Sequence, residues 1–136
     1  MTDFDREVLF DKAVEARENS YSPYSGYSVG AALLCSDGTV YTGCNIENAA
    51  FTPTVCAERV AIFKAVSDGR RDFAAIAVAG GKEGVEPCTP CGVCRQVMAE
   101  FCVPSSFELI LNGSDGLCHI TLGELFPGGF GPNNLK

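Results

Sequence analysis

Cysteine is unusually frequent in this chain, and its spacing limits the possible folds more than any other feature. Eight cysteines occur in 136 residues. The acidic N-terminus carries no apolar segment of the kind that directs secretion, so we expect a cytoplasmic protein with reduced thiols. Metal binding or catalysis then explains part of the set better than a disulfide framework does. We expect Cys88 to be a free loop thiol and the cysteines outside the motifs to be small buried apolar residues, at positions 35, 44, 102 and 118.

Two short segments carry the residues from which a metal centre can be built. The first reads Cys56-Ala57-Glu58-Arg59, and the second reads Pro90-Cys91-Gly92-Val93-Cys94-Arg95. Each segment is expected to open a helix, and cysteines in a first turn three residues apart lie on one face. The free N–H groups and positive dipole end of a helix favour thiolates. The spacing therefore predicts a zinc pocket where two helix ends meet.

The register of the second segment is open, because Cys88 and Cys91 form another pair with the same spacing. We favour Cys91 and Cys94, with Cys56 as the third ligand of one Zn²⁺ per chain. Three ligands leave the fourth position for water, which is typical of a catalytic site, and Glu58 can carry protons beside it. A fourth thiolate from Cys88 or Cys102 would close the site and indicate a structural zinc instead.

Two arginines follow the cysteine motifs directly. Three thiolates outweigh the charge of one zinc ion, which weakens the metal as a Lewis acid. Arg59 lies three residues after Cys56, and Arg95 lies four residues after Cys91. Guanidinium hydrogen bonds to the sulfurs would withdraw that charge. We therefore expect both arginines to support the zinc ligands from outside the coordination shell.

The apolar pattern predicts a single α/β domain over residues 1–136. Strands are expected at 29–35, 39–45, 73–79, 107–111 and 117–122, and helices at 4–20, 55–67, 90–101 and 123–126. Thr54 is the expected N-cap of the second helix, and Gly69 its stop. The link between the last two strands is too short for a parallel crossover, so this pair should be antiparallel. The order predicts a mixed five-stranded sheet with helices on both faces.

The charge balance narrows the class of partner. The chain has 10 Lys and Arg against 17 Asp and Glu, which gives a net charge of −7. Proteins that grip nucleic-acid backbones present a basic surface instead. No apolar run approaches the roughly 20 residues that span a bilayer. We therefore expect neither a nucleic-acid polymer nor a membrane as partner.

Several motifs together resemble the small homotetrameric cytidine deaminases with three zinc cysteines. Besides the two cysteine segments, the motifs are Tyr21–Ser25, Val29–Ala32, Gly43–Ala49 and Leu125–Pro127. A three-cysteine variant is a described signature of zinc deaminases. The resemblance covers nearly the whole chain and implies the three-layer cytidine deaminase-like fold. It also implies hydrolytic deamination of cytidine and deoxycytidine to uridine and deoxyuridine, with release of ammonia, in pyrimidine salvage.

The resemblance also implies a role for each matching residue. Cys56, Cys91 and Cys94 match the zinc ligands; zinc-bound hydroxide would attack C4 of the base while Glu58 shuttles protons. Asn45 and Glu47 match the residues that hold the sugar 3′-hydroxyl of a free nucleoside. Further substrate contacts are implied for Tyr27, for Ala57 and for Phe130, the last across a subunit boundary in a homotetramer with shared active sites. Tyr27 stands where many relatives carry phenylalanine.

Two alternatives belong to other classes. One is a related zinc deaminase that acts on dCMP, blasticidin, guanine or tRNA adenosine, although the tRNA enzyme would be expected to show a basic face. The other is a non-catalytic interaction module stapled by zinc, which requires four protein ligands. Ammonia release and the number of metal ligands discriminate these alternatives.

Overall fold

A five-stranded sheet forms the centre of the protein. The computed structural model describes residues 4–135, and residues 1–3 and 136 of the predicted domain lie outside that range. The sheet order is β2-β1-β3-β4-β5. The strands are β1 (Ser28–Cys35), β2 (Val40–Cys44), β3 (Phe73–Gly81), β4 (Glu108–Gly113) and β5 (Gly116–Thr121). Of these five strands only β3 and β4 pair in parallel, so the predicted mixed sheet with an antiparallel last pair is confirmed.

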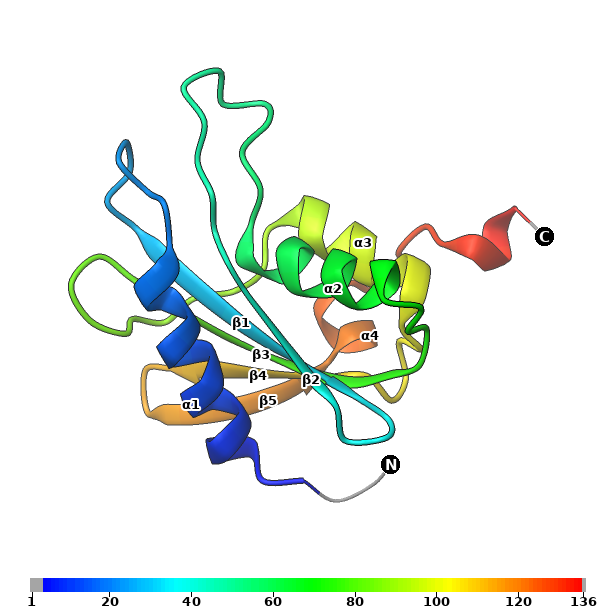
Figure 1. Cartoon of the computed structure of the whole chain (residues 1–136). Coiled ribbons are helices and arrows are strands. Elements are labelled where there is room, and N and C mark those ends of the chain that lie inside the picture. The colour runs from blue at the N-terminus through cyan, green and yellow to red at the C-terminus, as the bar shows by residue number, and fades with distance from the viewer. Residues whose placement is uncertain (1–3, 136) are drawn as a thin grey trace.

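Helices cover both faces of this sheet, as Figure 1 shows. α1 (Arg6–Ala16) lies on one face; α2 (Ala57–Ser67), α3 (Gly92–Phe101) and α4 (Leu122–Leu125) lie on the other. Two short 3₁₀ turns, Arg17–Asn19 and Pro132–Asn134, complete the elements. The predicted three-layer α/β architecture is therefore confirmed. Every helix between residues 4 and 135 is too short or too polar to cross a membrane.

The central strand β3 supplies both hydrophobic cores, because its alternate side chains point to opposite faces. Ile76 and Val78 pack beneath α2 and α3, whereas Ala75 and Ala77 pack beneath α1. The α1 face is lined mainly by small residues, which lets that helix approach closely. A Cβ at Gly30 would lie only 2.0 Å from the backbone oxygen of Ala13.

The start of α2 differs from the prediction. Cys56, not Thr54, is the N-cap, so the helix begins two residues later than a Thr54 cap would place it. The reason is a tertiary backbone pairing: Val55 exchanges two hydrogen bonds with Ile46, both 3.0 Å, which keeps the chain extended until Cys56. The predicted stop is confirmed, since Gly69 adopts a φ of 90° directly after the C-cap.

Gly43 fixes the position of α2 on the sheet. A Cβ at this residue of β2 would lie 2.6 Å from both the oxygen of Ala57 and the nitrogen of Ala61. Real Cβ atoms do not approach backbone atoms so closely, so only glycine permits this contact. The first turn of α2, which carries Glu58, is therefore seated directly on the sheet.

Candidate metal centre

Three cysteine sulfurs meet where α2 and α3 begin. The Sγ atoms of Cys56 and Cys91 are 3.7 Å apart, and those of Cys91 and Cys94 are 3.4 Å apart. All three lie within 4.8 Å of one another. Cys56 and Cys91 are the N-caps of their helices, one position before the first turn in which both were expected, and Cys94 lies in the first turn of α3. The start of each helix therefore sets the direction of the sulfurs.

The donor set fits zinc. A tetrahedral centre with Zn–S bonds of about 2.3 Å places its sulfurs about 3.8 Å apart, close to the spacing found here. Among residues 4–135 this cluster contains three ligand groups and includes neither Cys88 nor Cys102. A fourth protein thiolate is therefore not supplied by either of these two cysteines. Three protein ligands leave one position for water, as in catalytic zinc sites.

The thiols of Cys56 and Cys94 do not ionise equally. Hydrogen bonding from Cys94, followed by that from Arg59 and Cys91, lowers the pKa of Cys56. The same contact with Cys56, together with burial, raises the pKa of Cys94. The thiolate of Cys56 is thus stabilised by a proton held on its neighbour. A metal that binds all three sulfurs must displace such protons, so its affinity rises with pH.

Glu58 is buried beside the sulfurs, in the first turn of α2. Its side chain is only 3% exposed. Burial is the main cause that raises the pKa of its carboxyl group to about 7, with a smaller contribution from the nearby Cys56 thiolate. A carboxyl group with a pKa near neutrality can both accept and donate a proton under ordinary conditions. Glu58 therefore has the environment of a general acid and base.

The two arginines have different partners. Arg59 donates from Nη2 to the Sγ of Cys56 at 3.4 Å, and also to the backbone oxygen of Thr54 at 3.5 Å. Arg95 instead donates to the backbone oxygens of Pro90, at 2.9 Å, and Leu125, at 3.2 Å. The expectation that Arg95 binds a sulfur therefore needs correction. Its guanidinium group donates to carbonyl oxygens of two nearby backbone segments of the same chain. Of the two arginines, only Arg59 donates a hydrogen bond to a cysteine of the cluster.

A small cavity opens beside the metal centre. Its volume is about 220 Å³, and Cys56, Cys91, Glu58, Asn45 and Tyr27 are among its lining residues. Among residues 4–135, Glu58 is the only carboxylate in this lining. The cavity therefore joins three of the predicted substrate and proton-transfer residues to two of the three predicted zinc ligands. It is the place where a small molecule can meet both the metal and the acid.

Asn45 lies at the end of β2 and is 9% exposed. Its side-chain oxygen accepts hydrogen bonds from the N–H of Val29, at 2.9 Å, and from the hydroxyl of Ser20. Its amide nitrogen donates to the carbonyl of Tyr27 at 2.8 Å. An amide nitrogen has two hydrogens, so one donor remains for a ligand in the cavity.

Glu47 does not line this cavity but an adjacent one of about 290 Å³. Its carboxylate accepts the N–H groups of Tyr24, at 3.0 Å, and Ser25, at 3.2 Å, and also the hydroxyl of Ser25. The Ser25 hydroxyl is the main cause that lowers the pKa of Glu47. Glu47 therefore fastens the loop that carries Tyr27, a function that sequence reasoning missed.

Two further predicted residues lie outside the cavity lining. Ala57 is the first residue of α2, and its side chain is fully buried. Phe130 lies on the C-terminal segment and is 54% exposed, and its carbonyl accepts a hydrogen bond from Gln96 at 2.8 Å. Within one chain, the structure does not bring Phe130 to the metal centre's cavity.

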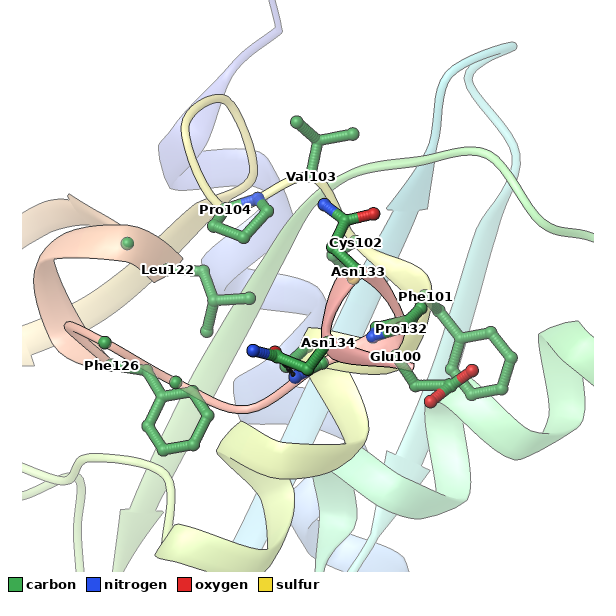
Figure 2. Close-up of a pocket in the computed structure, with 15 residues that line it drawn as sticks. Glu100, Phe101, Cys102, Val103, Pro104, Leu122, Phe126, Pro132, Asn133 and Asn134 are labelled. Carbon is green, nitrogen blue, oxygen red and sulfur yellow. Dashed lines mark hydrogen bonds between the residues drawn. The ribbon is translucent and has the colours of Figure 1, made fainter. Parts of the chain in front are cut away.

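A larger cavity lies away from the metal centre, between the end of α3, α4 and the C-terminal segment (Figure 2). Its volume is about 550 Å³, and Leu122, Phe126 and Asn134 contribute to its wall. None of the three clustered cysteines lines it. Although this cavity is larger than the one beside the metal centre, the chemistry of the lining residues points to the smaller cavity.

The remaining cysteines divide into three groups. Cys35 and Cys102 are buried, as predicted. Cys44 is half-buried and Cys118 is exposed on the edge strand β5, so the prediction for Cys118 is wrong. The apolar neighbours of Cys118 gave the wrong signal because the first four residues of the edge strand β5 are exposed, whichever face of the sheet they point to. Cys88 is a free thiol in a loop, yet it is half-buried and lines the cavity beside Glu58.

The structure thus combines a sheet flanked by helices, three clustered thiols and a buried carboxyl group beside one cavity. This combination is that of a zinc-dependent enzyme. The sequence profile of the cytidine and deoxycytidylate deaminase zinc-binding region matches residues 4–107. The chain therefore belongs to the cytidine and deoxycytidylate deaminase family, and its cofactor is zinc, one ion per three-cysteine centre.

Individual relatives agree over almost the whole chain. A cytidine deaminase of Sporosarcina psychrophila is 51% identical over 132 residues, covering 97% of this chain and 96% of the relative. The cytidine deaminase of Halalkalibacterium halodurans is 52% identical over 133 residues, covering 97% and 98%. The crystal structure of cytidine deaminase from Burkholderia pseudomallei superposes with a TM-score of 0.85 at 45% identity, covering 93% of this chain and all of that one.

Proposed function

We propose that this chain catalyses the hydrolytic deamination of cytidine and deoxycytidine to uridine and deoxyuridine, with release of ammonia. The observation that carries the proposal is one cavity lined by Cys56 and Cys91 of the sulfur cluster and by the buried carboxyl group of Glu58. Relatives named cytidine deaminase that cover 97% of the chain support the same activity.

Cys56, Cys91 and Cys94 would hold the zinc ion. Zinc in such a site supplies a Lewis acid that makes a water molecule acidic enough to act as a nucleophile at neutral pH. Arg59, through its hydrogen bond to Cys56, draws negative charge from one ligand and so preserves that acidity.

Glu58 moves the protons of the reaction. Its carboxylate accepts a proton from the attacking water and delivers it to N3 of the pyrimidine, which makes C4 more electrophilic. After the water oxygen has added to C4, Glu58 takes the second proton and delivers it to the departing amine. The bond from C4 to the amine breaks, and ammonia leaves. A pKa of about 7 suits both directions of transfer.

The sugar is held by groups with unused hydrogen-bonding capacity. Asn45 retains one amide hydrogen, which can be donated to a hydroxyl oxygen. A carboxylate offers about four acceptor positions; three of those on Glu47 are occupied, so one remains for the 3′-hydroxyl. As the first residue of α2, Ala57 has an N–H without a partner inside the helix, which suits a substrate oxygen.

A free nucleoside fits these groups better than a polymer. The negative charge of Glu47 would repel a phosphate on the 3′-oxygen. The net charge of −7 acts in the same direction. We therefore propose that nucleic-acid polymers are not substrates.

We further propose that residues 1–136 act as one deaminase domain that assembles into a homotetramer with shared active sites. Exposed aromatic groups support the assembly: Phe51 is 72% exposed and Phe130 is 54% exposed. Phe51 also lines the cavity that Glu47 lines and forms a T-shaped ring pair with Tyr24, with ring centroids 6.4 Å apart. A second copy that covers these rings would remove apolar area from water. Light scattering coupled to size exclusion measures the mass directly.

All eight cysteines lie within the described residues and are free thiols. Thiols persist in reducing compartments, and this supports our proposal of a cytoplasmic location.

The test of the activity is ultraviolet monitoring of cytidine conversion, with ammonia measured independently. Parallel reactions contain deoxycytidine, dCMP, guanine and a cytosine-containing oligonucleotide. We expect turnover of the two nucleosides, loss of turnover in a chelator and recovery with added Zn²⁺. Turnover of dCMP or guanine alone would instead identify a deaminase with another substrate. A metal count of one per chain without any ammonia release would favour the interaction module.

A further inference from the structure

Cys88 is half-buried and lines the cavity next to Glu58, although it is not part of the sulfur cluster. It shares this wall with Tyr27. Both side chains converge on Gly80 of β3. A Cβ at Gly80 would lie 2.8 Å from the Sγ of Cys88 and 2.9 Å from a ring carbon of Tyr27. The two side chains therefore fill the space that any larger residue at position 80 would occupy.

Tyr27 connects this wall to the groups that face the sugar. Its carbonyl oxygen accepts the hydrogen bond of Asn45 at 2.8 Å. Its N–H donates to the hydroxyl of Ser25 at 3.0 Å, and that hydroxyl in turn donates to Glu47. A displacement of the Tyr27 ring would thus act on both proposed sugar-binding residues.

We propose that Cys88 is a positioning residue for the deamination: its thiol holds the Tyr27 ring against Gly80 and thereby sets the substrate-facing wall of the cavity. This inference rests on the proposed function, because the substrate is the nucleoside of that reaction. Cys88 acts through Tyr27 and takes part neither in zinc binding nor in proton transfer.

The chemistry of the thiol agrees with a packing and hydrogen-bonding role. Burial raises the pKa of Cys88, and its hydrogen bond with Tyr27 opposes this only in part. Burial and the contact with Cys88 also raise the pKa of Tyr27 to about 12. Both groups are therefore neutral around pH 7, and a neutral thiol is a weak nucleophile and a weak metal ligand.

The first experiment compares C88A, C88S and the control C118A, which removes an exposed thiol on β5. We expect C88A to raise KM for cytidine roughly 3- to 10-fold, the loss of one modest hydrogen bond, and to leave kcat within about twofold. The conservative C88S variant keeps a hydrogen-bonding group and should recover most of the affinity. Uridine titration by calorimetry should show the same order, and the zinc content should stay at the unmodified value.

The second experiment asks whether Cys88 and Tyr27 act as a unit. C88A and Y27F remove opposite ends of one contact, so the double variant should resemble the single variants rather than multiply their effects. G80A should raise KM further, since its methyl group meets both side chains. C88A should relieve part of the G80A defect by vacating the sulfur's position.

Wild-type KM in C88A, strictly multiplicative effects of C88A and Y27F, or loss of zinc from C88A would each overturn the inference. Failure of the unmodified protein to deaminate any nucleoside would overturn the proposed function instead. The two failures can be told apart: the inference about Cys88 is tested only by comparing variants with an unmodified protein that is active, whereas the proposed function fails when the unmodified protein itself is inactive.

Discussion

Glu58→Gln should inactivate the protein and, in the absence of metal, make it more stable at alkaline pH. Glutamine has nearly the same shape but cannot carry protons. Removal of a positioned general acid and base costs about 10²- to 10⁴-fold in rate. Within residues 4–135, no second carboxylate lines the cavity to replace it. We therefore expect kcat to fall by at least this factor while the zinc content is unchanged.

The stability change follows from the buried carboxyl group. Its pKa rises from 4.5 to about 7 on folding, chiefly because burial disfavours the charge. The unfolded chain thus releases this proton at lower pH than the folded chain, and stability falls as pH rises through this window. At about 1.4 kcal/mol per pH unit, the charged form costs ~3 kcal/mol above pH 7 and nothing below about pH 4. The glutamine variant avoids this cost because its amide does not titrate.

Urea unfolding of chelator-treated protein at pH 4.5 and pH 8 measures the difference. The variant and the parent should nearly coincide at the lower pH, and the variant should be more stable by up to ~3 kcal/mol at the higher pH. Glu15→Gln, on the exposed side of α1, is the matched control and should show no such divergence. A difference that is the same at both pH values would refute the electrostatic reasoning. Near-normal turnover by the variant would refute the role in proton transfer.

Three other perturbations have definite expected outcomes. Cys91→Ala should abolish turnover and reduce bound zinc well below one ion per chain, as measured by metal analysis, because it removes the ligand shared by both short sulfur contacts. Glu108→Gln should lower stability by about 1–3 kcal/mol at pH 7, since Glu108 accepts two hydrogen bonds from Arg6, at 2.7 and 2.8 Å. Arg6 also lowers the pKa of Glu108, so this difference should shrink as pH falls below about 4; equal urea midpoints at pH 7 would contradict it. Gly43→Ala should lower both the melting temperature and kcat, since the added methyl group meets the backbone of α2 at 2.6 Å and the cost of such overpacking is about 1–3 kcal/mol; an unaffected kcat in a destabilised variant would show that the seating of α2 does not govern Glu58.

The layers of the fold could be predicted because local patterns decided them. The short link before β5 required an antiparallel pair, and the structure has it. The exact start of α2 could not be predicted in the same way. Thr54 is a good N-cap by residue type, but the long-range pairing of Val55 with Ile46 keeps this segment extended.

In the candidate site, too, the features set by local sequence could be predicted and those set by long-range contacts could not. Cysteine spacing predicted the three-sulfur cluster, since helix starts hold such residues in a fixed relation. The partners of Arg95 were missed because the carbonyl of Leu125 is distant in sequence and reaches it only through folding. The structural roles of Glu47, which holds the loop of Tyr27, and of Cys88, which lines the cavity, were missed for a similar reason. Their contacts with Ser25 and Tyr27 depend on how a loop returns to the sheet, which no local pattern encodes.

The meeting of two N-caps has a mechanical consequence. An ion bound to Cys56 and Cys91 would tie together points 35 residues apart in the sequence, enclosing all of α2 and β3. Such a tether restricts the unfolded chain as a covalent cross-link does, and loop-closure entropy for this length amounts to roughly 4 kcal/mol. The ion would therefore stabilise the fold as well as take part in catalysis.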